Sequence, residues 1–500
     1  MRVVYLCQES AVGVRPMPLR APSVIVQPPT DGRRLDSGGH SAPRAVCARW
    51  FVKCIVPLVA SQITSLDWAL TSHAVDLKQT IGCLGTKYRT VREVTLSLAA
   101  RTSAEDQMVQ SCPEASPMKW HQAHTTWFFE TFVLRPFLPD YQPFRDEFRW
   151  LFNSYYNSLG EEVPEKHLRG VFSRPSLAEI SAFRRHVDEA MEWLFAGHID
   201  GEAARRIMLG LNHEQQHQEL MLTDIKHAFF TNPLRQAYID APLAAPREDS
   251  VSDFKWQGFD GGVHEIGYSL NSRNFLDFCF DNETPRHKVD LDDFRIANRS
   301  VTCREYLQFM SAGAYVRPEL WLSDGWEALR KYGWRAPLYW ERDPRDSTGW
   351  RIFTLRGWQP LSDLLQTPVC HVSFFEADAF ARWKGCRLPT EAEWELAANG
   401  RSIQGNLLDT GRLHPAIACG DGLDQLFGDT WEWTASPYTG YPGYRPLPGA
   451  LGEYNGKFMS GQMILRGGSC VTPASHLRAT YRNFFPPETR WQFTGIRLAA

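Results

Sequence analysis

Apolar side chains recur at the spacing of an amphipathic helix along much of the chain between residues 86 and 235. The pattern starts around Val91, Val94 and Leu98, and it continues through residues 119–137, 143–160, 176–197 and 212–230. The stretch 176–197 is predicted to start at Ser176, a good N-cap residue, and to end near Gly197. Four long helical stretches joined by connections predict a helix bundle over about 86–235.

The pattern changes after residue 235. A Pro- and Ala-rich stretch, residues 238–253, predicts a linker between domains. Beyond it, short aromatic segments alternate with turns, and two clear helices are predicted within 373–385 and 390–399. Residues 1–85 mix Pro, Gly, Ser and Arg without sustained periodicity, which is typical of a disordered or atypical extension. We therefore expect an extension over 1–85, a bundle domain over 86–240 and a second domain over 241–500.

Composition and charge narrow the classes of partner. A net charge of -3 gives no electrostatic reason to expect nucleic acid or an anionic membrane as a partner. The apolar stretch that begins at Trp50 contains Lys53, Pro57 and Asp67, so it falls short of a membrane span. The eleven cysteines are scattered and never spaced as CxxC, which favours reduced thiols in a cytoplasmic protein.

The stretch "LNHEQQHQELML" contains two candidate metal ligands. His213 and His217 are four residues apart in a helical pattern, so both imidazoles project from one face. They could bind a metal ion, or they could be two exposed histidines on a polar helix. His124 lies among apolar residues of another predicted helix, and bundle cores are places where facing helices assemble metal sites. A zinc ion bound by three imidazoles would activate water, whereas a ferrous ion could bind dioxygen and a substrate side by side. The spacing of the histidines does not distinguish between these two metals.

Several long motifs, in this order along the chain, carry a family resemblance: "SPMKWHQAHTTWFFETFVL", "LFNSYYNSLGE", "LNHEQQHQELML", "GDTWEWTASPY", "LRGGSC" and "YRNFFPPETRWQFTGIRLA". Over about residues 86–500 the chain resembles the sulfoxide synthases of ergothioneine biosynthesis. The resemblance implies an α+β multidomain fold. A DinB-like four-helix bundle would be followed by a C-type-lectin-like mixed α/β domain of the formylglycine-generating-enzyme type.

The same resemblance implies a cofactor and a reaction. Ferrous iron, Fe(2+), would be held by His124, His213 and His217, with His121 as the rival to His124 within its motif. The reaction would use dioxygen to join the imidazole carbon of hercynine (N-alpha-trimethylhistidine) to a thiol as a sulfoxide. Iron can collect the reactants in one coordination sphere, which makes their encounter intramolecular.

Two neighbouring tyrosines are the candidate proton donors. Family members place the catalytic tyrosine either in the lectin-like domain or as a pair in the bundle, and "LFNSYYNSLG" resembles the second arrangement. We therefore expect Tyr155 to be catalytic, with Tyr156 beside it at the substrate. The alternative is that both rings are aromatic packing at a helix end.

The resemblance also implies substrate contacts. Matching positions for hercynine are Gln216, Asn483 and Phe484, and Phe485 could add a second ring. Where gamma-glutamylcysteine-using relatives have an acid and an arginine, this chain has Phe485 and Thr489, with Arg490 one residue further on. The sequence therefore favours free cysteine as the thiol over gamma-glutamylcysteine, with Arg490 as a candidate contact.

Other functions remain as alternatives. A formylglycine-generating enzyme would need a cysteine pair near the carboxyl end, where Cys470 is alone. An ovothiol-type 5-histidylcysteine sulfoxide synthase would join cysteine to histidine itself, and a selenoneine-type synthase would transfer selenium to hercynine. The alternative from another class is a non-catalytic lectin-like binding protein, which the presence of all three histidines disfavours.

Overall fold

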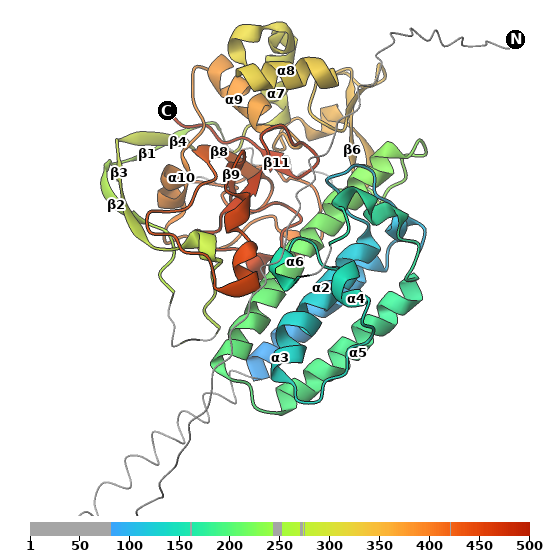
Figure 1. The fold of residues 1–500 in the computed structure, drawn as a ribbon. Coiled ribbons are helices and arrows are strands. Elements are labelled where there is room, and N and C mark those ends of the chain that lie inside the picture. The colour runs from blue at the N-terminus through green and yellow to red at the C-terminus, as the bar shows by residue number, and fades with distance from the viewer. Residues whose placement is uncertain (1–81, 161–162, 244–252, 271–273, 275, 421) are drawn as a thin grey trace, which may run out of the picture. The chain divides into compact units, whose positions relative to one another are not determined.

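The computed structural model describes residues 82–160, 163–243, 253–270, 274, 276–420 and 422–500. Within these residues a helical part is followed by a mixed α/β part (Figure 1). The extension predicted over 1–85 lies almost wholly outside the described residues, and so do residues 244–252 of the predicted linker. No helix in the described residues is long and apolar enough to cross a lipid bilayer.

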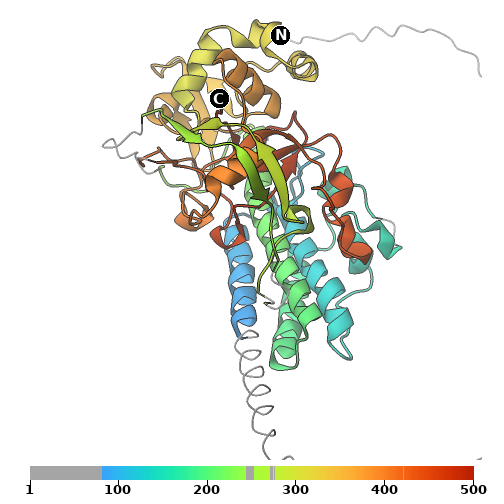
Figure 2. The same ribbon diagram turned by 90° about the vertical axis from the view of Figure 1, so that its left-hand side faces the viewer.

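Four long helices form the first part, and three of them overlap the stretches predicted over 119–137, 176–197 and 212–230. The first runs through residues 82–99. The second is α2 (Met118–Phe129), which continues through a π-helical turn, η2 (Glu130–Leu134), into α3 (Arg135–Phe137). The third and fourth are α5 (Leu177–Ala196) and α6 (Gly201–Thr231). Figure 2 shows the blue helix of residues 82–99 running alongside the green α6, where the Gln218 side chain donates to the carbonyl of Val91.

The predicted ends of α5 are confirmed. Ser176 accepts a hydrogen bond from the backbone N–H of Glu179, whose carboxylate accepts in return from Ser176, and Gly197 is the C-cap. The helix predicted over 143–160 is wrong for most of its length. Within this range only α4 (Phe148–Leu151) and one short 3-10 turn, η3 (Asn157–Leu159), form, and a second 3-10 segment, η4 (Lys166–Val171), follows it. Asn153 explains the break, because its side chain bonds both the N–H and the carbonyl of Tyr156 and so competes with the helix.

Aromatic packing and one buried ion cluster hold the helices together. Trp127, Phe128 and Phe129 of α2 are fully buried. On α6, a side chain at Gly210 would collide with the ring of Phe129, so glycine lets the two helices approach closely. Glu214 of the same helix is fully buried, and its carboxylate lies 2.9 Å from Arg92 and 2.6 Å from Arg184.

The second part contains short strands in small sheets. The β1 (Trp256–Phe259) and β4 (Phe294–Ala297) strands pair, and so do β2 (Gly262–Ile266) and β3 (His287–Leu291). A three-stranded sheet has the order β5 (Trp340–Arg342), β6 (Trp350–Thr354) and β7 (Gly357–Pro360). The largest sheet has the order β10 (Asn483–Phe485), β9 (Met463–Arg466), β8 (Trp431–Pro437) and β11 (Thr494–Gly495), and only β8 and β11 are parallel within it.

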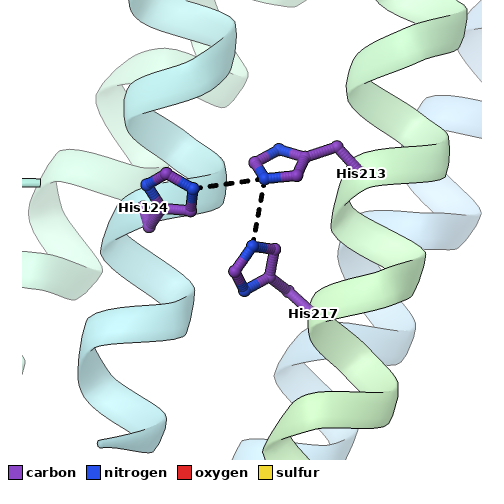
Figure 3. Close-up of side chains that lie close together, drawn as sticks. All are labelled: His124, His213 and His217. Carbon is purple, nitrogen blue, oxygen red and sulfur yellow. Dashed lines mark hydrogen bonds between the residues drawn. The ribbon is translucent and has the colours of Figure 1, made fainter. Parts of the chain in front are cut away.

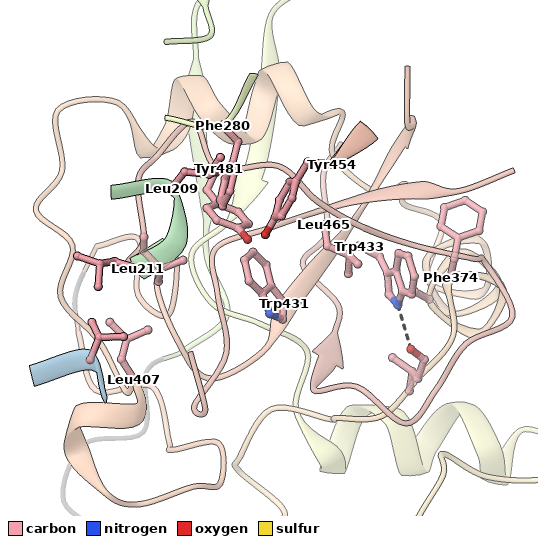
Figure 4. Packing of buried hydrophobic residues seen from close by; sticks show 14 of the residues in the cluster. Leu209, Leu211, Phe280, Phe374, Leu407, Trp431, Trp433, Tyr454, Leu465 and Tyr481 are labelled. Carbon is pink, nitrogen blue, oxygen red and sulfur yellow. Dashed lines mark hydrogen bonds between the residues drawn. The ribbon is translucent and has the colours of Figure 1, made fainter. Parts of the chain in front are cut away.

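Helices cover these sheets and confirm two further predictions. The α9 (Phe374–Trp383) and α10 (Glu391–Ala398) helices start at the capping residues Ser373 and Thr390, as the sequence pattern indicates. Two more helices, α7 (Cys303–Ser311) and α8 (Ser323–Tyr332), precede them. Figure 4 shows the aromatic core around β8, in which Trp431 points toward Tyr454 and Tyr481.

The α6 helix joins the two parts. Its Glu219 accepts hydrogen bonds from Trp431, Ser469 and Thr472 of the second part. One turn earlier, Gln215 donates to the hydroxyl of Ser475. The helix that carries His213 and His217 is therefore fixed directly against the mixed α/β part.

Candidate metal centre and substrate cavity

Three histidines converge between two helices. Figure 3 shows His124 on α2 facing His213 and His217 on α6. The Nε2 atom of His213 lies 3.2 Å from Nε2 of His124 and 3.0 Å from Nε2 of His217. One ring nitrogen from each histidine falls within 4.8 Å of the others. This spacing allows all three nitrogens to bind one metal ion.

Hydrogen bonding and burial give these imidazoles the electronic state that a metal requires. The Nδ1 atom of His124 lies 2.6 Å from the carbonyl oxygen of Phe152, which can only accept. Nδ1 therefore carries the proton, and the lone pair on Nε2 points toward His213. Burial lowers the pKa of His124 and His217 and lowers the pKa of His213 to about 3, so all three rings are neutral near pH 7. Neutral imidazoles whose ring nitrogens converge fit a divalent cation.

His121, the rival within the same motif, lies outside this triad. Its Nδ1 is 2.7 Å from Nδ1 of His217, and its Nε2 is 3.1 Å from a carboxylate oxygen of Asp224. Among the described residues, His124 rather than His121 completes the cluster of potential ligands. His121 instead contacts the side of His217 that faces away from the triad.

A cavity of about 530 Å³ opens beside the triad, and residues of both parts line it. The bundle contributes Trp120, His213 and His217, and the second part contributes Trp431, Tyr454, Tyr481 and Trp491. Five of the predicted site residues also line the cavity: Tyr155, Gln216, Asn483, Phe484 and Phe485. A site with these walls needs both parts of the chain.

The amide of Gln216 is held at both ends by tyrosines. Its Nε2 donates to the hydroxyl of Tyr481 at 2.6 Å, and its Oε1 accepts from the hydroxyl of Tyr454. The Tyr481 hydroxyl also lies 3.0 Å from Nε2 of His476, whose Nδ1 lies 3.1 Å from the side-chain oxygen of Asn212. This network fixes the orientation of the amide before any ligand binds.

The two neighbouring tyrosines have different surroundings. Tyr155 lines the cavity, and its ring stacks on that of Tyr156 with the centroids 4.7 Å apart. Tyr156 does not line it, and its buried ring packs beside Trp127 and Phe132. Burial raises the pKa of both phenols, so both are protonated at neutral pH.

Arg490 points away from the cavity. Its guanidinium lies 3.3 Å from the carboxylate of Glu376 and donates to the carbonyl of Ala336 at 2.6 Å. Its neighbour Thr489 does line the cavity. The structure therefore brings Thr489, and not Arg490, to the predicted substrate contacts.

Two cationic residues that the sequence reasoning missed line the cavity, Lys166 and Arg169. Arg169 lies 3.5 Å over the ring of Trp120 and donates to the hydroxyls of Ser116 and Ser154. Burial lowers its pKa to about 9, although the negative charge of Asp224 opposes this shift. The only sequence signal is a pair of basic residues three apart, shortly after the tyrosine pair.

Both parts of the chain are similar to known proteins. The family described as the sulfatase-modifying factor enzyme 1-like domain matches residues 259–416 and 412–500. Two proteins named hercynine oxygenase are 31% identical. The protein of Mycolicibacterium smegmatis aligns over 439 residues, which cover 82% of this chain and 96% of its own length. The protein of Mycobacterium tuberculosis aligns over 415 residues, which cover 77% of this chain and 91% of its own length. A formylglycine-generating enzyme of Thermomonospora curvata is 26% identical over 45% of this chain and 87% of its own length. Matches as long as the first two must include the helical part as well.

Proposed function

The chain belongs to the hercynine oxygenase family, and we propose that it is an iron- and dioxygen-dependent sulfoxide synthase that joins hercynine to a thiol in ergothioneine biosynthesis. The observation that carries this proposal is the convergence of three neutral imidazoles beside a cavity built by both parts of the chain. A formylglycine-generating enzyme is disfavoured, because that protein aligns with less than half of this chain.

We propose that His124, His213 and His217 hold the iron. Among the described residues the cluster offers nitrogen donors only, and the neighbouring carboxylate of Glu214 is already bonded to Arg92 and Arg184. Iron(II) with three imidazole ligands would supply a redox-active centre with open coordination positions for dioxygen and both substrates. The roles of the other residues follow from where they lie around that centre.

Hercynine carries a trimethylammonium group, which cannot donate a hydrogen bond and favours aromatic faces. The cavity offers such faces together with the fixed amide of Gln216 and the side chain of Asn483; the aromatic residues are Trp120, Trp431, Tyr454, Tyr481, Phe484 and Phe485. The amide oxygen of Gln216 brings a partial negative charge to the same wall. These residues would orient hercynine while its imidazole faces the triad.

The thiol substrate would bind at the cationic wall. Arg169 and Lys166 line the cavity, and a substrate carboxylate would pair with the buried guanidinium of Arg169. Phe485 and Thr489 offer no charge to a second carboxylate or ammonium group. Since Glu376 already pairs with Arg490, the structure supports free cysteine over gamma-glutamylcysteine as the thiol.

Tyr155 would donate a proton during the reaction. Its phenol is protonated at neutral pH and lines the same cavity as His213 and His217. The buried ring of Tyr156 supports it from behind at 4.7 Å. A positioned donor of this kind contributes about 100- to 10,000-fold to a rate.

The test is reconstitution of the purified chain with Fe(II) under anaerobic conditions. Adding hercynine, cysteine and dioxygen should give oxygen uptake and a product whose mass equals hercynine plus cysteine, less two hydrogens and plus one oxygen. Replacing hercynine by histidine tests the ovothiol-type alternative in the same assay. The proposal is wrong if the iron-loaded protein consumes no oxygen with hercynine and either cysteine or gamma-glutamylcysteine, or if histidine is used in preference to hercynine.

A further inference from the structure

Two histidines of one motif have different positions around the triad. His124 faces Nε2 of His213, whereas His121, one helical turn earlier, contacts His217 from the opposite side. His121 is buried and its ring centroid lies 5.0 Å from that of His217. The contact joins the two Nδ1 atoms at 2.7 Å, so the Nε2 atom of His217 stays free to face the triad.

The direction of each hydrogen bond follows from the partner at its end. The carboxylate of Asp224 accepts from Nε2 of His121 at 3.1 Å, so that nitrogen carries the proton. The other nitrogen of a neutral imidazole is then an acceptor, and Nδ1 of His121 accepts the N–H of His217. His217 therefore has its proton on Nδ1 and its lone pair on Nε2.

Asp224 is itself held in place by both parts of the chain. One carboxylate oxygen accepts the backbone N–H of Ser116 at 2.8 Å, and the other accepts the indole N–H of Trp491 at 3.0 Å. Asp224 is buried, and Trp491 belongs to the carboxyl-terminal wall of the cavity. The second part of the chain is thereby connected to the metal centre by a continuous series of hydrogen bonds.

We propose that His121 and Asp224 are positioning residues that fix the tautomer and ring orientation of His217, with Trp491 anchoring them to the second part of the chain. This inference rests on the proposed metal site. Partners that accept the outer N–H of a ligating histidine orient the ring and raise its basicity, and their loss weakens metal binding by roughly 10- to 100-fold.

The experiment measures Co(II) binding by the metal-free chain, with the visible absorption of the bound ion reporting ligand geometry. His121→Phe keeps a ring but removes both hydrogen bonds, so Co(II) affinity should fall by roughly 10- to 100-fold and the bands should shift. His121→Gln should restore most of the affinity, since its amide can accept from His217 and donate to Asp224. His124→Ala, which removes a proposed ligand, should lose the bound ion.

A matched control is His227→Phe. His227 lies on α6 one turn beyond Asp224, is bonded to the hydroxyl of Ser111, and is not among the proposed ligands. The same substitution there should leave Co(II) affinity and spectrum unchanged. Thermal unfolding of each metal-free variant separates a lost fold from a lost site.

The outcomes are distinct. If the unsubstituted chain binds no Co(II), the proposed metal site itself is wrong. If it binds Co(II) and His121→Phe binds with the same affinity and spectrum, only the positioning role is wrong. If His121→Phe does not fold, Trp491→Phe decides: a several-fold weaker affinity with shifted bands supports the proposal, and unchanged binding overturns it.

Discussion

Glu219 accepts the indole N–H of Trp431 at 2.7 Å and so joins α6, the helix of His213 and His217, to strand β8. The hydroxyls of Ser469 and Thr472 donate to the same carboxylate at 2.8 Å and 2.7 Å. Glu219 is two residues beyond His217. These bonds therefore set the position of the triad relative to the wall that carries Asn483 and Phe484.

Replacing Glu219 by Ala should destabilise the contact between the two parts. Three buried donors would lose their acceptor, and each unpaired donor costs about 1–3 kcal/mol before water or local movement compensates. We expect a lower midpoint of thermal unfolding and a smaller effect for Glu219→Gln, whose amide oxygen still accepts. An unchanged midpoint in the Ala variant would show that the contact contributes little.

Replacing His213 or His217 by Ala should abolish iron loading and leave the bundle folded. The four long helices retain their aromatic core and the buried cluster around Glu214, so loss of one imidazole does not remove the main contacts. Iron content after anaerobic reconstitution, together with circular dichroism, checks this. Near-stoichiometric iron with normal turnover in either variant would contradict the proposed ligand set.

Local chemistry explains which features the sequence predicts. The ends of α5 follow from Ser176, Glu179 and Gly197, because capping depends on neighbouring residues alone. The pairing of His213 with His217 follows from helical geometry in the same way. The long motifs, in their order along the chain, indicate the family and therefore the fold of both parts. The comparisons with known proteins confirm the family.

Features that depend on long-range packing were not predictable from spacing. His121 and His124 are three residues apart on α2, and only the packing of α2 against α6 decides which of them reaches the triad. Arg490 is turned away by Glu376, a partner far earlier in the chain. Arg169 lies in a segment of 3-10 turns, where no periodic pattern indicates which side faces the cavity.

Replacing Tyr155 by Phe should slow sulfoxide formation while iron and substrate binding persist, because only the hydroxyl is removed. We expect a fall of about 100- to 10,000-fold in turnover if the phenol is the proton donor. A second expected outcome is diversion toward oxidation of the thiol alone, which product analysis would detect. Unchanged rate and product ratio would make Tyr155 structural, and Tyr156→Phe would be measured next.

Glu453 should stabilise the backbone that follows Tyr155 and Tyr156, and this stabilisation should depend on pH. Its carboxylate accepts the backbone N–H groups of Asn157 and Ser158 at 3.1 Å and 2.9 Å and pairs with Lys457 at 3.1 Å. Burial opposes ionisation, but these partners outweigh it and lower the pKa of Glu453 to about 2. A lowered pKa stabilises the fold above the ordinary value of 4.5, and this contribution is lost as pH falls toward 2.

Glu453→Gln tests this contribution. The thermal midpoint of the variant should lie below that of the unsubstituted chain at pH 6, and the difference should shrink as pH falls below 4.5. Iron loading should be unchanged, because Glu453 is not among the proposed ligands. A difference that is constant from pH 6 to pH 3 would contradict the assignment.

Cysteine should be preferred over gamma-glutamylcysteine as the thiol. The larger thiol adds a carboxylate and relocates the ammonium group, and each needs a partner when it leaves water. Phe485 and Thr489 provide neither charge, and Arg490 is already paired with Glu376. Competition between both thiols at fixed hercynine measures the ratio of specificity constants, and Arg169→Ala should lower both constants by removing the shared carboxylate partner. A higher specificity constant for gamma-glutamylcysteine would overturn the thiol assignment and leave the iron site intact.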